Sequence, residues 1–349
     1  MRSLLVCAVV GAAGTVIGVG YSKLVGGTPA IGALIGLSIG LAISAFELLV
    51  VSRSGLGTWL RRLSLPLFIG ITTFVWAAII IASLYLIPPL YDPSVPAYPY
   101  AQSNVVQDFI FSFVVSLTVN AAIRVRALLG SRVLLNFLLG RYHHPLREER
   151  VFLFLDLAGS SALAERLGDV RVQSFIGRFF FDIARPIAEL GGETHRYIGD
   201  EVVVTWPLRR AVKDARCVRC VLAIQALVAA RAQWYQGEFG TVPRFRVGMH
   251  GGPVVVSEIG DTKREIVYFG DTINTAARLE QMCKELHRDF LISGDLLRQV
   301  RLPHGVVAEA LGELALPGKA RKLDIYALSS ASTERAADTG QTRSAHGRS

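Results

Sequence analysis

The sequence is poor in cysteine and in charged residues. Only four cysteines occur among 349 residues, which excludes a small disulfide-stabilised scaffold. Charged residues make up 19%, less than the roughly 25% of a typical soluble chain. Hydrophobic residues make up 51% and the mean hydropathy is +0.41, so the chain is neither disordered nor collagen-like. This composition predicts a membrane protein, and the length favours about two domains.

Most of the long apolar stretches lie before residue 124. A membrane-spanning helix needs roughly 20 mostly apolar residues. The first stretch follows Arg2 but lacks the small-residue cleavage pattern of a signal peptide, and the last is short and contains Asn120. The predicted spans are residues 4–21, 30–51, 66–87 and 109–123. We therefore expect an all-α membrane domain of four transmembrane helices over residues 1–128.

The distribution of arginine predicts the orientation of these spans. No Lys or Arg occurs between Arg62 and Arg124, whereas arginines flank the second, third and fourth spans on the other side. The positive-inside rule then places everything after residue 123 in the cytoplasm of a multi-pass protein of the cell (inner or plasma) membrane. Contact with anionic lipid partly explains the net charge of +9. We expect no nucleic-acid partner, because no basic stripe with interleaved aromatic residues is present.

Two segments flank the soluble half. Residues 129–150 form a predicted amphipathic linker, which is either an interfacial helix on the bilayer or a parallel two-helix contact that transmits dimer geometry. Residues 329–349 are rich in Ser, Thr, Ala and Arg without periodicity, which predicts a disordered tail.

Residues 151–328 alternate between strand and helix patterns, which indicates an α+β domain with helices packed on a sheet. The pattern predicts a hairpin whose turn holds Asp200, and a second strand pair around Gly251-Gly252-Pro253. Cys217 and Cys220 fall in a predicted helix without further zinc ligands, so we expect buried, reduced thiols. The predicted strands are residues 151–155, 194–198, 202–206, 245–250, 254–259, 290–292 and 323–328, and the predicted helices run to residue 190, over 210–236 and over 272–284.

Asp156 and Asp200 occupy positions that suit a metal-binding site. Asp156 follows the apolar strand 151–155, and Asp200 lies in the hairpin turn, so both carboxylates emerge at one sheet edge if strand and hairpin are neighbours. Mg²⁺ prefers such oxygen ligands. The backbone amides of Gly159, Ser160 and Ser161, which open a helix, suit a phosphate. The alternative is structural: an Asp at a strand end often caps a helix, and an Asp after Gly often serves a turn.

A third group of residues begins the helix after Gly270. Asn274 and Arg278 are four residues apart and share one helix face. An amide and a guanidinium that project together suit a phosphoryl group in its transition state. The alternative is again structural, with Asn at a helix start and Arg on the surface.

Together these segments resemble the catalytic domain of class III nucleotidyl cyclases, the adenylyl and guanylyl cyclases, in a membrane-anchored, bacterial-type form. The resemblance covers residues 151–328 and implies a ferredoxin-like catalytic fold. The matching segments are 154–161 (FLDLAGSS) and 191–200 (GGETHRYIGD) for the two metal motifs, 247–256 (VGMHGGPVVV) for the central hairpin, and 270–279 (GDTINTAARL) for the Asn-x-x-x-Arg motif.

The resemblance implies a homodimer with each active site built across the interface. Asp156, Asp200 and the Leu157 carbonyl would hold two Mg²⁺ or Mn²⁺ ions, one activating the ribose 3′-hydroxyl and one binding pyrophosphate. Asn274 and Arg278 of the partner subunit would orient the ribose and stabilise charge at the α-phosphate. The implied reaction converts ATP to 3′,5′-cyclic AMP and pyrophosphate in intracellular signalling.

Three positions depart from the family pattern. Arg196 replaces the Lys of adenine-selecting cyclases, Val267 replaces an Asp or Thr, and Pro317-Gly318-Lys319 replaces Lys-Gly-Lys, which leaves Lys319 as the phosphate ligand there. Arg pairs with the O6/N7 edge of guanine, but Val267 accepts from neither purine's amine. ATP is therefore expected on family frequency alone. A guanylyl or dual-specificity cyclase is one alternative, and a catalytically silent cyclase-like membrane receptor module is another.

Overall fold

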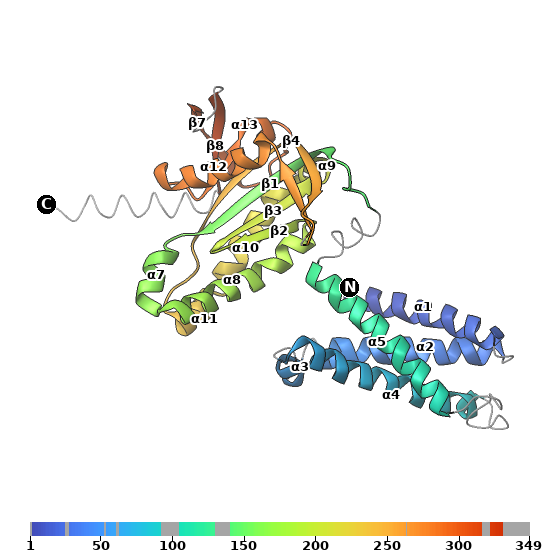
Figure 1. The fold of residues 1–349 in the computed structure, drawn as a ribbon. Helices are drawn as coiled ribbons and strands as arrows, with labels where there is room; N and C mark the ends of the chain where they lie inside the picture. The colour runs from blue at the N-terminus through green and yellow to red at the C-terminus, as the bar shows by residue number, and fades with distance from the viewer. Residues whose placement is uncertain are drawn as a thin grey trace. The chain divides into compact units, whose positions relative to one another are not determined.

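The computed structural model describes residues 2–24, 28–51, 54–60, 63–91, 105–129, 140–262, 264–315 and 322–330. These residues form two compact units, Met1–Leu138 and Leu139–Ser349 (Figure 1). Lys319, residues 130–139 of the predicted linker and residues 331–349 of the predicted tail lie outside the described residues.

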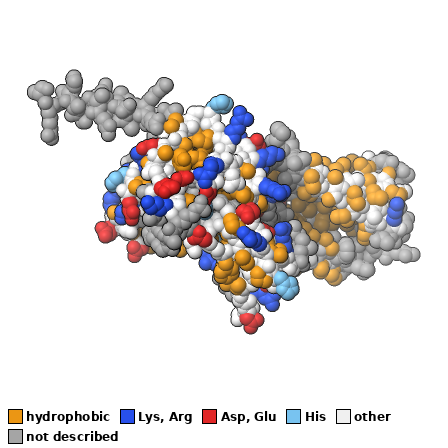
Figure 2. Space-filling view, turned by 90° about the horizontal axis from the view of Figure 1, so that it is seen from above, with side chains coloured by type: hydrophobic (Ala, Val, Ile, Leu, Met, Phe, Trp, Pro, Cys, Tyr) orange, Lys and Arg blue, Asp and Glu red, His pale blue; other side chains and the backbone are white. Residues whose placement is uncertain are grey.

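The N-terminal unit is helical, and helices form at all four stretches that were predicted to span a membrane. Among the described residues, Pro29–Val51 and Leu65–Leu90 are long and apolar enough to cross a bilayer, whereas the other two stretches give shorter apolar segments. Hydrophobic side chains cover much of the visible surface of these helices (Figure 2). The elements are α1 (Arg2–Leu24), α2 (Pro29–Ala45), η1 (Phe46–Val51), α3 (Gly55–Leu60), α4 (Leu65–Tyr91) and α5 (Val105–Leu129).

Small residues let α1 and α2 pack closely. A Cβ atom on Gly14 would lie 2.2 Å from the carbonyl oxygen of Gly36, and one on Gly18 would lie 2.0 Å from that of Gly32. Larger residues would force the two helices apart, and such small-residue contacts are typical of helix pairs in membranes.

The second unit is built on one mixed sheet with the strand order β2-β3-β1-β4-β6-β8-β7, and β5 pairs with β4 beside this path. β1 lies antiparallel to both β3 and β4, whereas β4 and β6 are parallel. The order β2-β3-β1-β4 with intervening helices is the ferredoxin-like arrangement. The strands are β1 (Leu146–Leu157), β2 (Glu193–Ile198), β3 (Glu201–Pro207), β4 (Phe245–Ile259), β5 (Glu265–Phe269), β6 (Phe290–Ser293), β7 (Val306–Ala315) and β8 (Lys322–Ser330).

Helices cover both faces of this sheet. The main ones are the amphipathic α8 and α10, whose apolar sides pack on one face, and α12, which packs on the other. The helices are α7 (Ser160–Leu167), α8 (Asp169–Glu189), α9 (Leu208–Val212), η2 (Lys213–Ala215), α10 (Arg216–Ala230), α11 (Ala232–Phe239), α12 (Asp271–Glu285) and α13 (Gly294–Leu297).

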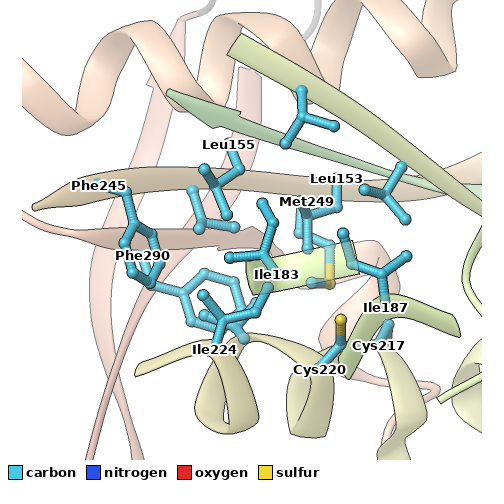
Figure 3. Packing of buried hydrophobic residues seen from close by; sticks show 14 of the residues in the cluster. Leu153, Leu155, Ile183, Ile187, Cys217, Cys220, Ile224, Phe245, Met249 and Phe290 are labelled. Atoms are coloured by element: carbon cyan, nitrogen blue, oxygen red, sulfur yellow. The ribbon is translucent and has the colours of Figure 1, made fainter. Parts of the chain in front are cut away.

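The alternation of side chains along β1 decides which face carries the acids. Leu153 and Leu155 point into the core formed with α8 and α10 (Figure 3), where Cys217 and Cys220 also lie buried. Burial raises the pKa of both thiols to about 12, as expected for inert cysteines. Phe152 and Phe154 of β1 pack on the α12 side. By the same period of two, Asp156 faces α12.

The predicted strand pair around Gly251-Gly252-Pro253 is wrong: residues 245–259 form the single strand β4, which pairs with β1 along residues 245–256. Pro253 is tolerated because it lies between the stretch of β4 that pairs with β6 and the stretch that pairs with β5. Pro253 also lies opposite Glu149 of β1, but its carbonyl oxygen accepts a hydrogen bond from Thr272 Oγ1 at 2.7 Å on the other side. Since the nitrogen of a strand residue faces the same side as its carbonyl oxygen, the missing N–H breaks no ladder hydrogen bond.

Other boundaries also differ from the predictions. β1 begins at Leu146, so part of the predicted linker belongs to the sheet, and β8 extends to Ser330. The predicted helix over 210–236 is broken into α9, η2, α10 and α11, because Asp214 and Ala215 adopt positive φ angles. β5 and β7 were not predicted at all.

Arg150 belongs to the part of the predicted linker that forms the start of β1. Its side chain is buried, and its Nε donates to Thr205 Oγ1 at 3.1 Å. Its two terminal nitrogens form ion pairs with Glu148 and Glu193, each at 3.1 Å, while the guanidinium lies over the ring of Tyr268. Arg150, which falls in the predicted linker, thus connects β1 with β2, β3 and β5 through its guanidinium.

Candidate active site

Asp156 and Asp200 meet at one edge of the sheet. Asp156 is the penultimate residue of β1, and Asp200 lies in the turn between β2 and β3, where Gly199 takes a φ of +61°. The amide of Leu157 donates to the carbonyl oxygen of Asp200 at 3.4 Å, which ties the turn to β1. The two carboxyl groups lie close enough together that Asp200 raises the pKa of Asp156. The structure therefore brings together the two acids that were predicted to bind metal.

The electrostatics of this pair fit a divalent cation. Burial and the neighbouring Asp200 together raise the pKa of Asp156 to about 6, although Arg246 opposes the shift. A cation between the carboxylates would compensate their negative charge. Among the described residues no group of three or more His, Cys, Asp or Glu gathers as a metal site. A metal here would bind two carboxylates and the Leu157 carbonyl plus substrate oxygens, as Mg²⁺ typically does.

Further acids, which the sequence analysis missed, stand behind the pair. Glu201 lies opposite Asp156 in the ladder between β1 and β3, and Glu280 is buried on α12. Burial, together with the charge of Asp156, raises the pKa of each to about 7. Arg246, opposite Asp156 on β4, lowers the pKa of both Asp156 and Glu280. The single guanidinium of Arg246 therefore favours the ionised form of both Asp156 and Glu280.

The position of Glu280 depends on how closely α12 crosses β4. A Cβ atom on Gly248 would lie only 2.1 Å from the backbone nitrogen of Glu280. Because Gly248 has no side chain, α12 packs closely enough on β4 for Glu280 to interact electrostatically with Asp156. Glu201 could have been suspected from its place next to Asp200, whereas the sequence holds no signal for this helix crossing.

A cavity of about 330 Å³ adjoins the end of β1. Leu157, Gly159 and Ser160 line it, together with the exposed Arg166 and Arg244, and Ser161 lies on the exposed first turn of α7. Gly159 adopts a φ of +79° and offers no side chain to cap the first amides of α7. Free helix amides and two cationic side chains favour an anionic group such as a phosphate. Neither arginine was predicted.

Arg196 and Val267 lie on β2 and β5, which approach each other: the rings of His195 and Tyr268 make an edge contact at 4.9 Å. The guanidinium of Arg196 forms an ion pair with the carboxylate of Glu265. Since Glu265 precedes Val267 by two residues, the two side chains share a face of β5. A carboxylate that was not predicted, that of Glu265, therefore lies on the same face of β5 as Val267.

Asn274 and Arg278 lie on α12, with Asn274 exposed and Arg278 half-buried. In the part of the chain that the structure describes, no hydrogen bond or ion pair joins either of them to Asp156 or Asp200. The same helix thus carries Glu280 toward the acids of its own unit and leaves Asn274 open to other molecules.

Comparison with known proteins identifies the second unit. A family model described as the adenylate and guanylate cyclase catalytic domain matches residues 144–330. The chain is 48% identical over 223 residues to adenylate cyclase 2 of Rhizobium meliloti, an alignment that covers 64% of this chain and 61% of that protein. It is 29% identical over 187 residues to adenylate cyclase 1 of the same organism, with coverage of 52% and 27%.

A solved structure supports the fold. A bacterial light-regulated adenylyl cyclase superimposes with a TM-score of 0.55 at 18% identity, over 65% of this chain and 67% of that one. The chain spans less than two thirds of the length of the curated relatives it matches. The family match nevertheless covers more than half of the chain, from before the first strand of the sheet to its last residue. The chain therefore belongs to the family of adenylate and guanylate cyclase catalytic domains.

Proposed function

We propose that this chain is a membrane-anchored adenylyl cyclase that converts ATP to 3′,5′-cyclic AMP and pyrophosphate in intracellular signalling. The observation that carries the proposal is the convergence of Asp156 and Asp200 at one sheet edge, where the hydrogen bond from the Leu157 amide to the Asp200 carbonyl oxygen ties the β2–β3 turn to the end of β1. The 48% identity to a protein named adenylate cyclase 2 favours ATP over GTP. A cyclase that has lost turnover would have little reason to keep this costly pair of acids together.

In this proposal Asp156, Asp200 and the Leu157 carbonyl hold two Mg²⁺ or Mn²⁺ ions. When bound, the ions lower the pKa of the ribose 3′-hydroxyl and neutralise charge on the triphosphate. The amides of Gly159, Ser160 and Ser161 bind phosphate oxygens at the start of α7. Arg166 and Arg244 add positive charge to the adjoining cavity, and Lys319 adds a further cation in the family's triphosphate region.

The active site is completed by a second copy of the chain, whose Asn274 orients the ribose and whose Arg278 stabilises charge on the α-phosphate. Their accessibility on α12 supports this role. Tyr197 and Ile198 at the end of β2 and Phe269 at the end of β5 are 48%, 52% and 48% exposed. Exposed apolar side chains at the ends of these two strands, beside the Asp200 turn and shortly before α12, favour an interface there. Two-fold symmetry would then create two equivalent sites.

The N-terminal helices serve as the anchor in this proposal. Two of them reach the length and composition of a membrane span, and the arginine distribution favours a cytoplasmic catalytic unit. We assign residues 1–128 to the membrane domain, 129–145 to the linker, 146–330 to the catalytic domain and 331–349 to the tail. The experiment is fractionation of cells that express the full chain, with the protein expected in the inner or plasma membrane and resistant to extraction by salt.

The catalytic proposal is tested with purified full-length protein, Mn²⁺ and ATP. Cyclic AMP should accumulate, and Asp200→Asn should reduce its formation at least about a hundredfold, because it removes a metal ligand without changing the side-chain shape. Glu285→Gln, an exposed change on α12, is the matched control. A parallel reaction with GTP decides between an adenylyl cyclase and a guanylyl or dual-specificity cyclase.

A further inference from the structure

A cluster of basic side chains lies on α9, η2 and the first turn of α10. Residues 208–219 contain a single acid, Asp214, and five cations, which are Arg209, Arg210, Lys213, Arg216 and Arg219. Four of these cations are exposed, and Arg216 is half-buried. Five positive charges and one negative charge make this basic cluster the source of +4 of the net charge of +9. No step of the cyclase reaction proposed above uses this charge.

The fold neutralises little of this charge. Within the described part of the chain, the four exposed cations of the basic cluster take part in no ion pair. Arg216 approaches Asp214 only to 3.9 Å. The guanidinium of Arg216 also lies beside Gly191, in the turn between α8 and β2, but the carboxylates that flank this turn, Glu189 and Glu193, are paired with other arginines. The basic cluster therefore presents uncompensated positive charge at the surface of the unit.

The basic cluster lies at the end of the sheet where the chain enters the second unit. α9 begins directly after Pro207, which is opposite Arg150 near the start of β1 (Figure 1). Asp156 follows Arg150 by six residues along β1, a distance of about 20 Å. Residues 130–139 join α5 to this end, and ten residues span at most about 36 Å. A bilayer that holds α5 is therefore within reach of the basic cluster, and contact there would leave the catalytic edge open.

We propose that the basic cluster binds the anionic surface of the bilayer in which the chain is anchored, an inference that rests on the anchoring proposed above. Groups of about four to eight Lys and Arg beside a membrane span bind anionic lipid, because the cytoplasmic leaflet carries a negative surface potential. Guanidinium groups also donate paired hydrogen bonds to phosphate oxygens. A nucleic acid offers similar charge, but the tether keeps the leaflet at a high local concentration, which favours the bilayer.

The test measures amine acetylation by mass spectrometry in full-length protein reconstituted into lipid nanodiscs. Lys213 reports on the basic cluster, and the exposed Lys284 is the internal reference, because it follows Cys283, whose thiol contacts β4 near the catalytic end. Replacing about a third of the phosphatidylcholine by phosphatidylserine should lower the acetylation rate of Lys213 relative to Lys284 about threefold or more. Salt at about 1 M, which shortens the Debye length to about 3 Å, should remove this protection.

The double variant Arg209→Gln/Arg210→Gln should lose most of the protection of Lys213 by phosphatidylserine. Arg288→Gln/Arg301→Gln is the matched control, because it removes the same charge from two exposed positions outside the basic cluster and should keep the protection.

Three results would overturn the proposal while the anchoring stands. They are equal acetylation of Lys213 in neutral and anionic nanodiscs, equal protection by free glycerol phosphate in neutral nanodiscs, and stronger protection there by an oligonucleotide at the same phosphate concentration. Failure of the chain to enter nanodiscs would contradict the anchoring, and this proposal with it.

Discussion

Arg246 stands directly opposite Asp156 in the ladder between β1 and β4, on the face of the sheet that α12 covers. Burial and Asp200 raise the pKa of Asp156 to about 6, and the positive charge of Arg246 limits this rise. The same charge lowers the pKa of the buried Glu280. Arg246 therefore keeps the acids ionisable near neutral pH, in the state that a metal ion requires.

Removal of this charge should shift the pH dependence of activity. In Arg246→Met the pKa of Asp156 rises further, so protons compete with the metal up to a higher pH. The acid limb of the pH–activity profile, measured with saturating ATP, should move to higher pH by about one unit. Arg246→Lys keeps the charge and should move the limb less. An unmoved acid limb in Arg246→Met would show that this arginine does not govern the ionisation of Asp156.

The stability of the metal-free protein should fall as the pH rises. Asp156, Glu201 and Glu280 have folded-state pKa values of about 6, about 7 and about 7, all above their ordinary values. The folded state therefore holds more protons than the unfolded state between about pH 4 and about pH 7, and it loses this stabilisation across that window. Thermal melting in the presence of a chelator should show Tm decreasing through this range, and added Mn²⁺ should reverse much of the loss.

Glu280→Gln should separate the contribution of the buried acid on α12. The amide keeps the shape but needs no proton, so the variant should melt a few degrees higher than wild type above about pH 7 without metal. Glu285→Gln, an exposed change on the same helix, should have little effect. Melting of Glu280→Gln below wild type at all pH values would indicate a carboxylate that the fold needs in its charged form.

Complementation tests whether two subunits share each site. Asp200→Asn and Arg278→Ala should each be nearly inactive as homodimers, because each removes one half of both sites. A mixed dimer contains one site with both halves intact, so co-expression should restore up to about half of the wild-type activity per dimer. Cyclic AMP formation by the co-purified, differently tagged subunits provides the measurement. Persistent inactivity of the mixed dimer would place both residues in one subunit's site.

The ion pair between Arg196 and Glu265 should influence the choice of purine. In Glu265→Gln the guanidinium is released from its carboxylate and becomes free to pair with the O6/N7 edge of guanine. The ratio of kcat/KM for ATP to that for GTP should therefore fall several-fold. Glu309→Gln, which breaks a comparable exposed ion pair with Arg288, is the control. An unchanged ratio would show that the pair lies outside the purine site.

The convergence of Asp156 and Asp200 was predictable, because a strand beside a hairpin places its end next to the hairpin turn. Glu280 and Arg246 were not, since their roles depend on the crossing of α12 over Gly248 and on the register between β1 and β4. Gly-Gly-Pro is a strong local turn signal, yet tertiary pairing overrides it at Pro253. Glu265 escaped notice because β5 was not predicted.

The central claim is that Asp156 and Asp200 hold the metal ions of a nucleotide cyclisation site. The most direct measurement is Mn²⁺-dependent formation of cyclic AMP from ATP by purified full-length wild type, Asp156→Asn and Asp200→Asn, each with its folding checked by thermal melting. The wild type should form cyclic AMP, and both folded variants should lose at least about a hundredfold in kcat. A folded variant that retains near-wild-type turnover would contradict the assignment.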